Sequence, residues 1–89
     1  MNRRPERLKH LASTTCDIFS NRLQEAIDDA ETNKTEMERD GVCDRDTLKS
    51  YVNRSKMPSG RTLLYICNYL NVSADWLLGL TNEKRTVWT

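Results

Sequence analysis

The sequence predicts two short helices that follow each other with almost no chain between them. Asn33 can cap a helix over 34–40, because a glutamate stands three residues after it as a capping-box partner. Gly41 supplies a stop signal, and Asp44 can cap the next predicted helix, 45–53. A connection of about four residues forces two helices to cross sharply and to pack against each other. This pair restricts the fold more than any other part of the chain.

Apolar residues at spacings of three and four predict three further helices and an all-α fold class. One would span 21–31, with a single apolar stripe and an acidic outer face. The others would span 60–70 and 74–78, where Ser59 and Ser73 can act as N-caps. No strand is expected, because apolar residues nowhere alternate cleanly over five positions. The apolar stripe of the first helix consists of Phe19, Leu23, Ala26, Ile27 and Ala30.

With 89 residues, 37% of them hydrophobic and 30% charged, the chain suits one small soluble domain. No apolar run approaches the roughly 20 residues that cross a bilayer, so no membrane partner is expected. The basic first segment lacks the apolar stretch of a secretory signal, which favours a cytoplasmic location. Three cysteines at long spacings and a lone histidine, His10, support neither a disulfide framework nor a zinc site, and no cofactor is expected.

The predicted domain spans 19–80, between an N-terminal basic arm, 1–18, and a short C-terminal tail, 81–89. A short helix at 6–11 could form within the arm, which we expect to fray. The basic residues of the arm could simply keep the chain soluble, or they could reach along phosphates or into a minor groove of DNA. These residues are Arg3, Arg4, Arg7 and Lys9.

Two segments carry motifs typical of a known family. The segment 62–80, TLLYICNYLNVSADWLLGL, contains a helix end, a Val-Ser cap and an aromatic-Leu-Leu-Gly turn. It resembles the last two helices of the lambda-repressor-like (Xre or Cro type) helix-turn-helix family, and 32–59 fits that family's two-helix unit without a gap. The chain departs from the family at Val42, where a glycine is usual, and at Thr32, where a buried leucine is usual. The resemblance implies a five-helix lambda-repressor-like helix-turn-helix domain.

The resemblance also implies a sequence-specific DNA-binding transcriptional regulator, a bacterial or phage repressor that binds double-stranded DNA in the nucleoid as a homodimer. It would read the major groove with the helix at 45–53. The residues support this independently, because Leu48, Tyr51 and Val52 turn to the core and leave polar side chains outside. The predicted base-reading residues are Arg45, Asp46, Lys49 and Ser50. The predicted phosphate-binding residues are Lys34, Asn53, Arg54, Ser55, Lys56 and Arg61.

For the surface that joins two copies, the last helix and the tail are favoured over the arm. Two copies would then occupy two half-sites about one helical turn of DNA apart. Four apolar side chains could supply contact area, namely Trp76, Leu80, Val87 and Trp88.

The same residues allow other interpretations. The charged side of the helix at 45–53 could be an ordinary solvated face, with Arg45 paired to Asp46 or Glu36. The acidic residues between positions 25 and 46 could instead dock a basic protein. The chain would then be an interaction module of antitoxin or anti-repressor type, with weak or no DNA binding. An enzyme is not expected, because no Ser–His–Asp or Cys–His set and no Gly-rich phosphate loop can be placed.

Overall fold

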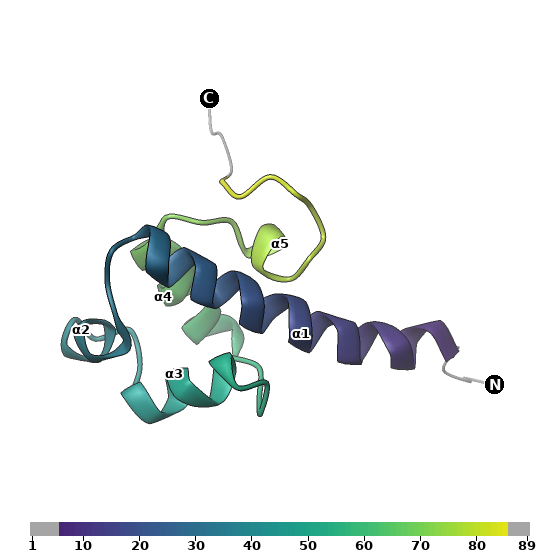
Figure 1. Cartoon of the computed structure of the whole chain (residues 1–89), viewed down its shortest axis with the longest axis horizontal. Helices are drawn as coiled ribbons and strands as arrows, with labels where there is room; N and C mark the ends of the chain where they lie inside the picture. The colour runs from purple at the N-terminus through teal and green to yellow at the C-terminus, as the bar shows by residue number, and fades with distance from the viewer. Residues whose placement is uncertain (1–5, 86–89) are drawn as a thin grey trace.

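The computed structural model describes the backbone of residues 6–85 and the side chains of residues 17–85. Its helices are α1 Glu6–Asp29, α2 Lys34–Arg39, α3 Arg45–Val52, α4 Gly60–Leu70 and α5 Ala74–Leu77. No strand occurs within the described part, so the all-α prediction is confirmed. Figure 1 shows α1 as a long rod with α5 on one side of it and α3 on the other, and its first turns project beyond the other helices.

α1 is one continuous helix of 24 residues, which makes two sequence predictions wrong. The sequence places the start of this helix at residue 21 and a separate arm over 1–18, whereas the helix begins at Glu6 and runs without a break through 13–15. The serine and threonines at 13–15 lower helix propensity by only about 0.5 kcal/mol each relative to alanine. No glycine or proline interrupts the segment, so nothing stops the helix from propagating.

The predicted roles of the basic residues at the start of the chain depend on side chains that the structure does not describe. Residues 1–5 lie outside the described part, and within residues 6–16 only the backbone is described. The minor-groove or phosphate role of Arg3, Arg4, Arg7 and Lys9 therefore stays a prediction.

The core forms where α1 packs against α3 and α5. The Phe19 ring meets the Tyr51 ring edge-on, with 6.1 Å between centroids. The buried Ser20 hydroxyl donates a 2.6 Å hydrogen bond to the carbonyl oxygen of Tyr51. An eight-residue helix is not stable alone in water, so these contacts hold α3 and decide which of its sides faces outward. The largest fully buried side chains are Phe19, Leu23, Met37, Leu48, Ile66 and Leu77.

Local capping places α2, α4 and α5 where the sequence predicts them. The N-caps predicted at Asn33, Ser59 and Ser73 are confirmed. In each case the side-chain oxygen accepts a hydrogen bond from the backbone N–H three residues later. Each cap satisfies one backbone donor that a helix start otherwise leaves without a partner, so these starts are specified by residues close in the sequence.

The N-terminus of α3 is capped by a residue that the sequence does not predict as its cap. Gly41 ends α2 with a φ of +87°, a conformation that glycine adopts readily. Asp44 stands at the N-cap position of α3, but its side chain makes no capping hydrogen bond, so that predicted role is wrong. The Arg45 backbone N–H instead donates to Glu38 Oε2 at 3.0 Å. A carboxylate from α2 therefore caps α3 and ties the two helices together.

Replacing Glu38 tests this cap. Glu38→Ala leaves the Arg45 N–H without its acceptor and should lower the free energy of unfolding by about 1 kcal/mol. Asp44→Ala is the matched control and should cost less, because no hydrogen bond to the backbone is lost. Urea unfolding followed by circular dichroism measures both. A larger loss for Asp44→Ala than for Glu38→Ala would show that Asp44 is the cap in solution.

Candidate nucleic-acid interface

The outward side of α3 carries the residues predicted to read bases. Leu48 and Tyr51 are buried against the core, which fixes the rotation of the helix about its axis. Arg45, Asp46 and Lys49 are exposed on the other side, and Arg45 and Lys49 stand four residues apart on one face. The remaining predicted base reader, Ser50, is half-buried, and its hydroxyl donates to the Asp46 carbonyl oxygen at 3.2 Å. Its oxygen keeps acceptor capacity for a further donor.

A surface hollow gathers four of the predicted residues. Lys34, from the first turn of α2, lines it together with Arg45, Asp46 and Lys49, and its volume is about 400 Å³. Three cations and one carboxylate make this hollow positive at neutral pH. A concave positive surface raises the local concentration of anions.

The cations of this hollow are not paired with carboxylates of the described side chains. Within residues 17–85, Lys34, Arg45 and Lys49 take part in no ion pair. Glu36, one of the partners considered for Arg45, instead pairs with Arg39 at 3.5 Å. An approaching anion therefore does not have to displace an ion pair from this side of α3.

Three of the predicted phosphate ligands take part in the turn after α3 instead of projecting freely. Arg54, at a φ of +70°, places its Nε 2.9 Å from Asp17 Oδ1, and its guanidinium also donates to Asn21 Oδ1 at 3.2 Å. The Asn53 Oδ1 accepts hydrogen bonds from both the backbone N–H and the hydroxyl of Ser55. Phosphate binding by Arg54 would require its contacts with α1 to open.

The other predicted phosphate ligands are available cations. Lys56 and Arg61 are exposed, and like Lys34 they form no ion pair within residues 17–85. Lys56 lies in the loop after α3, and Arg61 lies in the first turn of α4. Available cations therefore precede, occupy and follow α3 in the chain.

Arg22 is a residue whose importance the sequence does not reveal. Its guanidinium donates to the carbonyl oxygens of Trp76 at 2.5 Å and Thr81 at 2.8 Å, and to Asn82 Oδ1 at 3.2 Å. It also lies 5.0 Å from the centroid of the Trp76 ring, within the range of a cation–π interaction. Its main partners are more than fifty positions away along the chain, so no local sequence signal identifies them.

Lys84 also lies beside the Trp76 ring and connects the tail to α1. Its ammonium lies 5.0 Å from the Trp76 ring centroid and pairs with Glu25 at 3.1 Å and with Asp29. The hydrogen bond to Asp29, followed by that to Glu25, raises the pKa of Lys84, so the side chain stays charged at neutral pH. The backbone adds a contact, because the Ser73 N–H donates to the Lys84 carbonyl oxygen at 2.8 Å.

Because of these contacts, the prediction that Trp76 contributes to a dimer surface is wrong. Trp76 is only 4% exposed, because α1 and the tail cover it, so it cannot supply contact area to a second copy. Leu80 is 75% exposed and remains available. Val87 and Trp88 lie outside the described residues.

The two cysteines with described side chains are small packing residues. Cys43 and Cys67 are half-buried against the core and form no disulfide. Burial raises the pKa of both thiols, and for Cys43 the neighbouring Asp44 carboxylate adds to the effect. Both thiols are therefore protonated and weakly nucleophilic at neutral pH.

Substitution of Arg22 tests the fastening of the tail. Arg22→Ala removes charged donors from two carbonyl oxygens and should lower the free energy of unfolding by roughly 2 kcal/mol. Arg39→Ala is the matched control, because within residues 17–85 Arg39 makes only exposed ion pairs, with Glu36 and Asp40, and its loss should cost at most about 0.5 kcal/mol. Urea titration compares the two variants, and equal losses would contradict the structural role of Arg22.

The His, Cys, Asp and Glu side chains of 17–85 nowhere gather as a group of three able to hold a metal ion. Within residues 6–85, no helix has both the length and the apolar character needed to cross a bilayer.

Comparison of the chain with models of protein families, with curated proteins and with solved structures found no match.

Proposed function

We propose that the chain is a sequence-specific DNA-binding transcriptional regulator of the lambda-repressor-like helix-turn-helix type, and that α3 reads the major groove. The main support is the position of cationic side chains on the outer side of α3. Arg45 and Lys49 project from the outer side of α3 into a hollow shared with Lys34, while the inner side of the same helix is buried in the core. A rigid helix with cationic side chains on its outer face suits the width and charge of the major groove.

The arrangement of the helices gives further support. α2 and α3 are joined by only five residues, 40–44, and pack against each other. In Figure 1 they lie at one edge of the molecule and run in different directions. In a helix-turn-helix regulator the second of two such helices enters the groove and the first crosses the DNA backbone. Lys34 then stands where phosphates pass, at the start of α2.

Each outward side chain of α3 has a role that its chemistry allows. Arg45 can donate two hydrogen bonds to O6 and N7 of a guanine, the commonest specific contact between proteins and DNA. Asp46 can accept from a cytosine amino group or hold Arg45 in position. Lys49 can donate to guanine or to a phosphate, and Ser50 can accept from or donate to a base edge. Lys34, Lys56 and Arg61 are the proposed phosphate ligands.

Arg45→Ala should weaken binding to the cognate duplex by about 1–3 kcal/mol and relax the preference at one base position. The cognate duplex is first obtained by selecting bound duplexes from a random pool, and binding is then measured by fluorescence anisotropy. Arg39→Ala is the matched control, because Arg39 is paired on α2 and does not line the hollow. Unchanged affinity and base preference for Arg45→Ala would refute the groove assignment.

Salt dependence tests the phosphate contacts separately. With Lys34, Lys56 and Arg61 as the cationic ligands, the slope of log K against log salt should be roughly −2.7, and a fourth contact would make it roughly −3.6. Lys56→Ala should weaken all duplexes alike and flatten the slope by about one unit. If the slope indicates a fourth contact and the Arg54→Ala variant lacks it, Arg54 leaves Asp17 when DNA binds. A slope near zero would contradict phosphate binding altogether.

A protein-interaction module of the same fold is the second candidate, and the acids beside the hollow favour it. Asp46 lines the hollow, and Asp44 and Glu38 stand at the start of α3. Against it, Glu25 and Asp29 of the acidic face of α1 are already paired with Lys84. Measurement of duplex binding at low salt separates the two candidates, because a protein-interaction module that has lost DNA binding shows no affinity for any duplex.

The Asp46→Asn variant tests the role of Asp46. Tighter binding of all duplexes would show that Asp46 repels DNA, and a switched base preference would show that Asp46 reads a base.

A further inference from the structure

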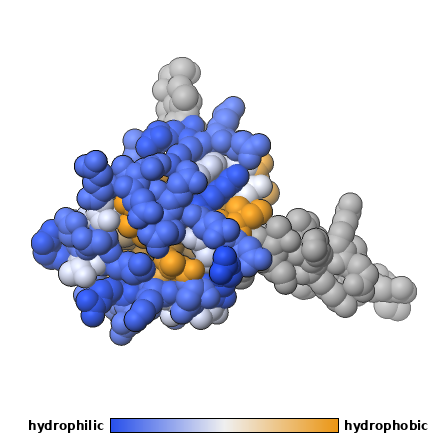
Figure 2. All heavy atoms as spheres, viewed as in Figure 1, coloured by the Kyte–Doolittle hydropathy of each residue, from blue (hydrophilic) through white to orange (hydrophobic). Residues whose placement is uncertain are grey.

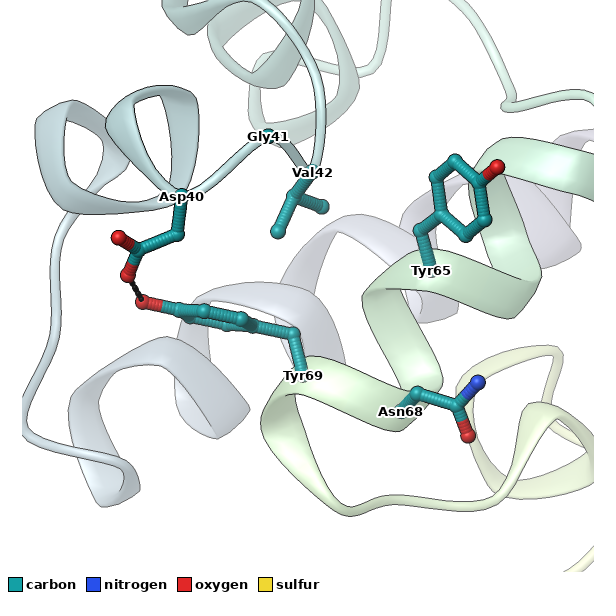
Figure 3. Close-up of a pocket in the computed structure, with 6 residues that line it drawn as sticks. All are labelled: Asp40, Gly41, Val42, Tyr65, Asn68 and Tyr69. Carbon is teal, nitrogen blue, oxygen red and sulfur yellow. Dashed lines mark hydrogen bonds between the residues drawn. The ribbon is translucent and has the colours of Figure 1, made fainter.

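A second hollow, at the end of α2, has a charge opposite to that of the hollow beside α3. It lies between the turn after α2 and α4, and its volume is about 450 Å³ (Figure 3). Among the side chains described in 17–85, those that line it include one carboxylate and no cation. A concave surface of this sign attracts cations and repels the phosphates of DNA. This acidic hollow is lined by Asp40, Gly41, Val42, Tyr65, Asn68 and Tyr69.

A hydrogen bond fixes one end of the acidic hollow. The Tyr69 hydroxyl donates to Asp40 Oδ2 at 2.5 Å, which holds the carboxylate beside the Tyr69 ring. This hydrogen bond raises the pKa of Tyr69, and the charges of Asp40 and Glu36 raise it further, so the potential at the hydroxyl is negative. Arg39 Nε stands 3.8 Å from Asp40 Oδ1 in an exposed ion pair. A carboxylate has about four acceptor positions, so Asp40 can bond to a further donor.

The other end of the acidic hollow is aromatic. In Figure 3 the Tyr65 ring stands across from Asp40, and Gly41 and Val42 lie on the turn between them. Arg61, one turn before Tyr65 on α4, does not line the hollow. The arrangement suits a long side chain that has an apolar stem and a positive head, because such side chains lay the stem along apolar surface.

We propose that the acidic hollow binds an arginine side chain from a basic segment of a partner protein. The stem of the arginine lies beside Val42 and Tyr65, and its guanidinium bonds to Asp40 next to the Tyr69 ring. A guanidinium donates two parallel hydrogen bonds to a carboxylate and stacks on aromatic rings, whereas the lysine ammonium is a compact and strongly hydrated charge. Arginine and tyrosine are also among the residues that supply most of the binding energy in protein interfaces.

The surroundings of the acidic hollow favour a protein segment over a free small molecule. Tyr65 is 46% exposed, so the hollow is open, whereas small-molecule pockets bury about 70–90% of their ligand. Leu64 is 57% exposed beside it and offers apolar contact to the residues that flank the arginine. Hydrophilic residues dominate the face of the molecule drawn in Figure 2, where apolar residues show only in small patches. A charged anchor in a hollow therefore suits this molecule better than a broad apolar contact.

A nuclear magnetic resonance titration of the full chain with a blocked hexapeptide tests the site. The peptide carries one arginine flanked by leucine and alanine, and two control peptides carry lysine or citrulline instead, the latter with the shape of arginine but no charge. The arginine peptide should bind with a roughly millimolar dissociation constant, because it offers a single anchor, and should shift the amide signals of 40–42 and 65–69. The lysine peptide should bind more weakly, and the citrulline peptide should leave these signals in place.

Three variants of the chain complete the test. Asp40→Asn keeps an acceptor for the Tyr69 hydroxyl and should weaken binding of the arginine peptide about fivefold or more. Tyr65→Ala should weaken binding about threefold through lost ring contact. Arg39→Ala removes the cation that competes for Asp40 and should tighten binding about twofold. Circular dichroism should show unchanged helix content in all three, because each replaced side chain is exposed.

The titration also gives results that would overturn the proposal. These are equal binding of the citrulline or lysine peptide, unchanged binding to Asp40→Asn, and shifts confined to the acidic side of α1 at 25–31. None of these outcomes bears on DNA binding, because no residue that lines the acidic hollow is a proposed DNA contact. The Arg45 and Lys56 variants test that function independently.

Discussion

The contact between α1 and the end of α3 is the constraint on which the rest of the structure depends. Tyr51 accepts a hydrogen bond from Ser20 through its carbonyl oxygen and packs its ring against Phe19. Leu48 is completely buried one turn earlier in α3. Because α3 is too short to persist alone, its direction and rotation are set by these tertiary contacts. The placement of Arg45 and Lys49 on the outside follows from what is fixed on the inside.

Eight of the ten cations in residues 17–85 fall into two groups with different physical roles. Arg22, Arg54 and Lys84 make contacts within the molecule, where they bond to carbonyl oxygens or carboxylates of α1, α5 and the tail. The other group, Lys34, Arg45, Lys49, Lys56 and Arg61, forms no ion pair with the side chains of residues 17–85. A net charge of +1 conceals this division, because Asp17, Glu25 and Asp29 pair with the first group. The hollow beside α3, lined by three cations and one carboxylate, is therefore more positive than the composition of the whole chain indicates.

What could be predicted from the sequence is what depends on neighbours in the sequence. The starts of α2, α4 and α5 follow from the caps Asn33, Ser59 and Ser73. The buried side of α3 follows from the helical spacing of Leu48 and Tyr51. The start of α1 was not predictable from its apolar stripe, because the helix continues through polar residues that weaken it only slightly. The contacts of Arg22, Arg54 and Glu38 depend on chain segments that only the fold brings together.

The same distinction applies to the candidate site. The sequence predicts that Arg45, Asp46 and Lys49 are exposed and lie near Lys34, and the structure places them so. Asn53, Arg54 and Ser55 are instead engaged in the turn after α3. The base and phosphate contacts themselves stay predictions. A titration of the isotopically labelled chain with random-sequence duplexes at low salt, followed through backbone amide shifts, shows directly whether α3 meets DNA. We expect the largest changes at residues 45–50 and near positions 34, 56 and 61. Changes confined to the acidic side of α1 at 25–31, or no changes at all, would contradict this expectation.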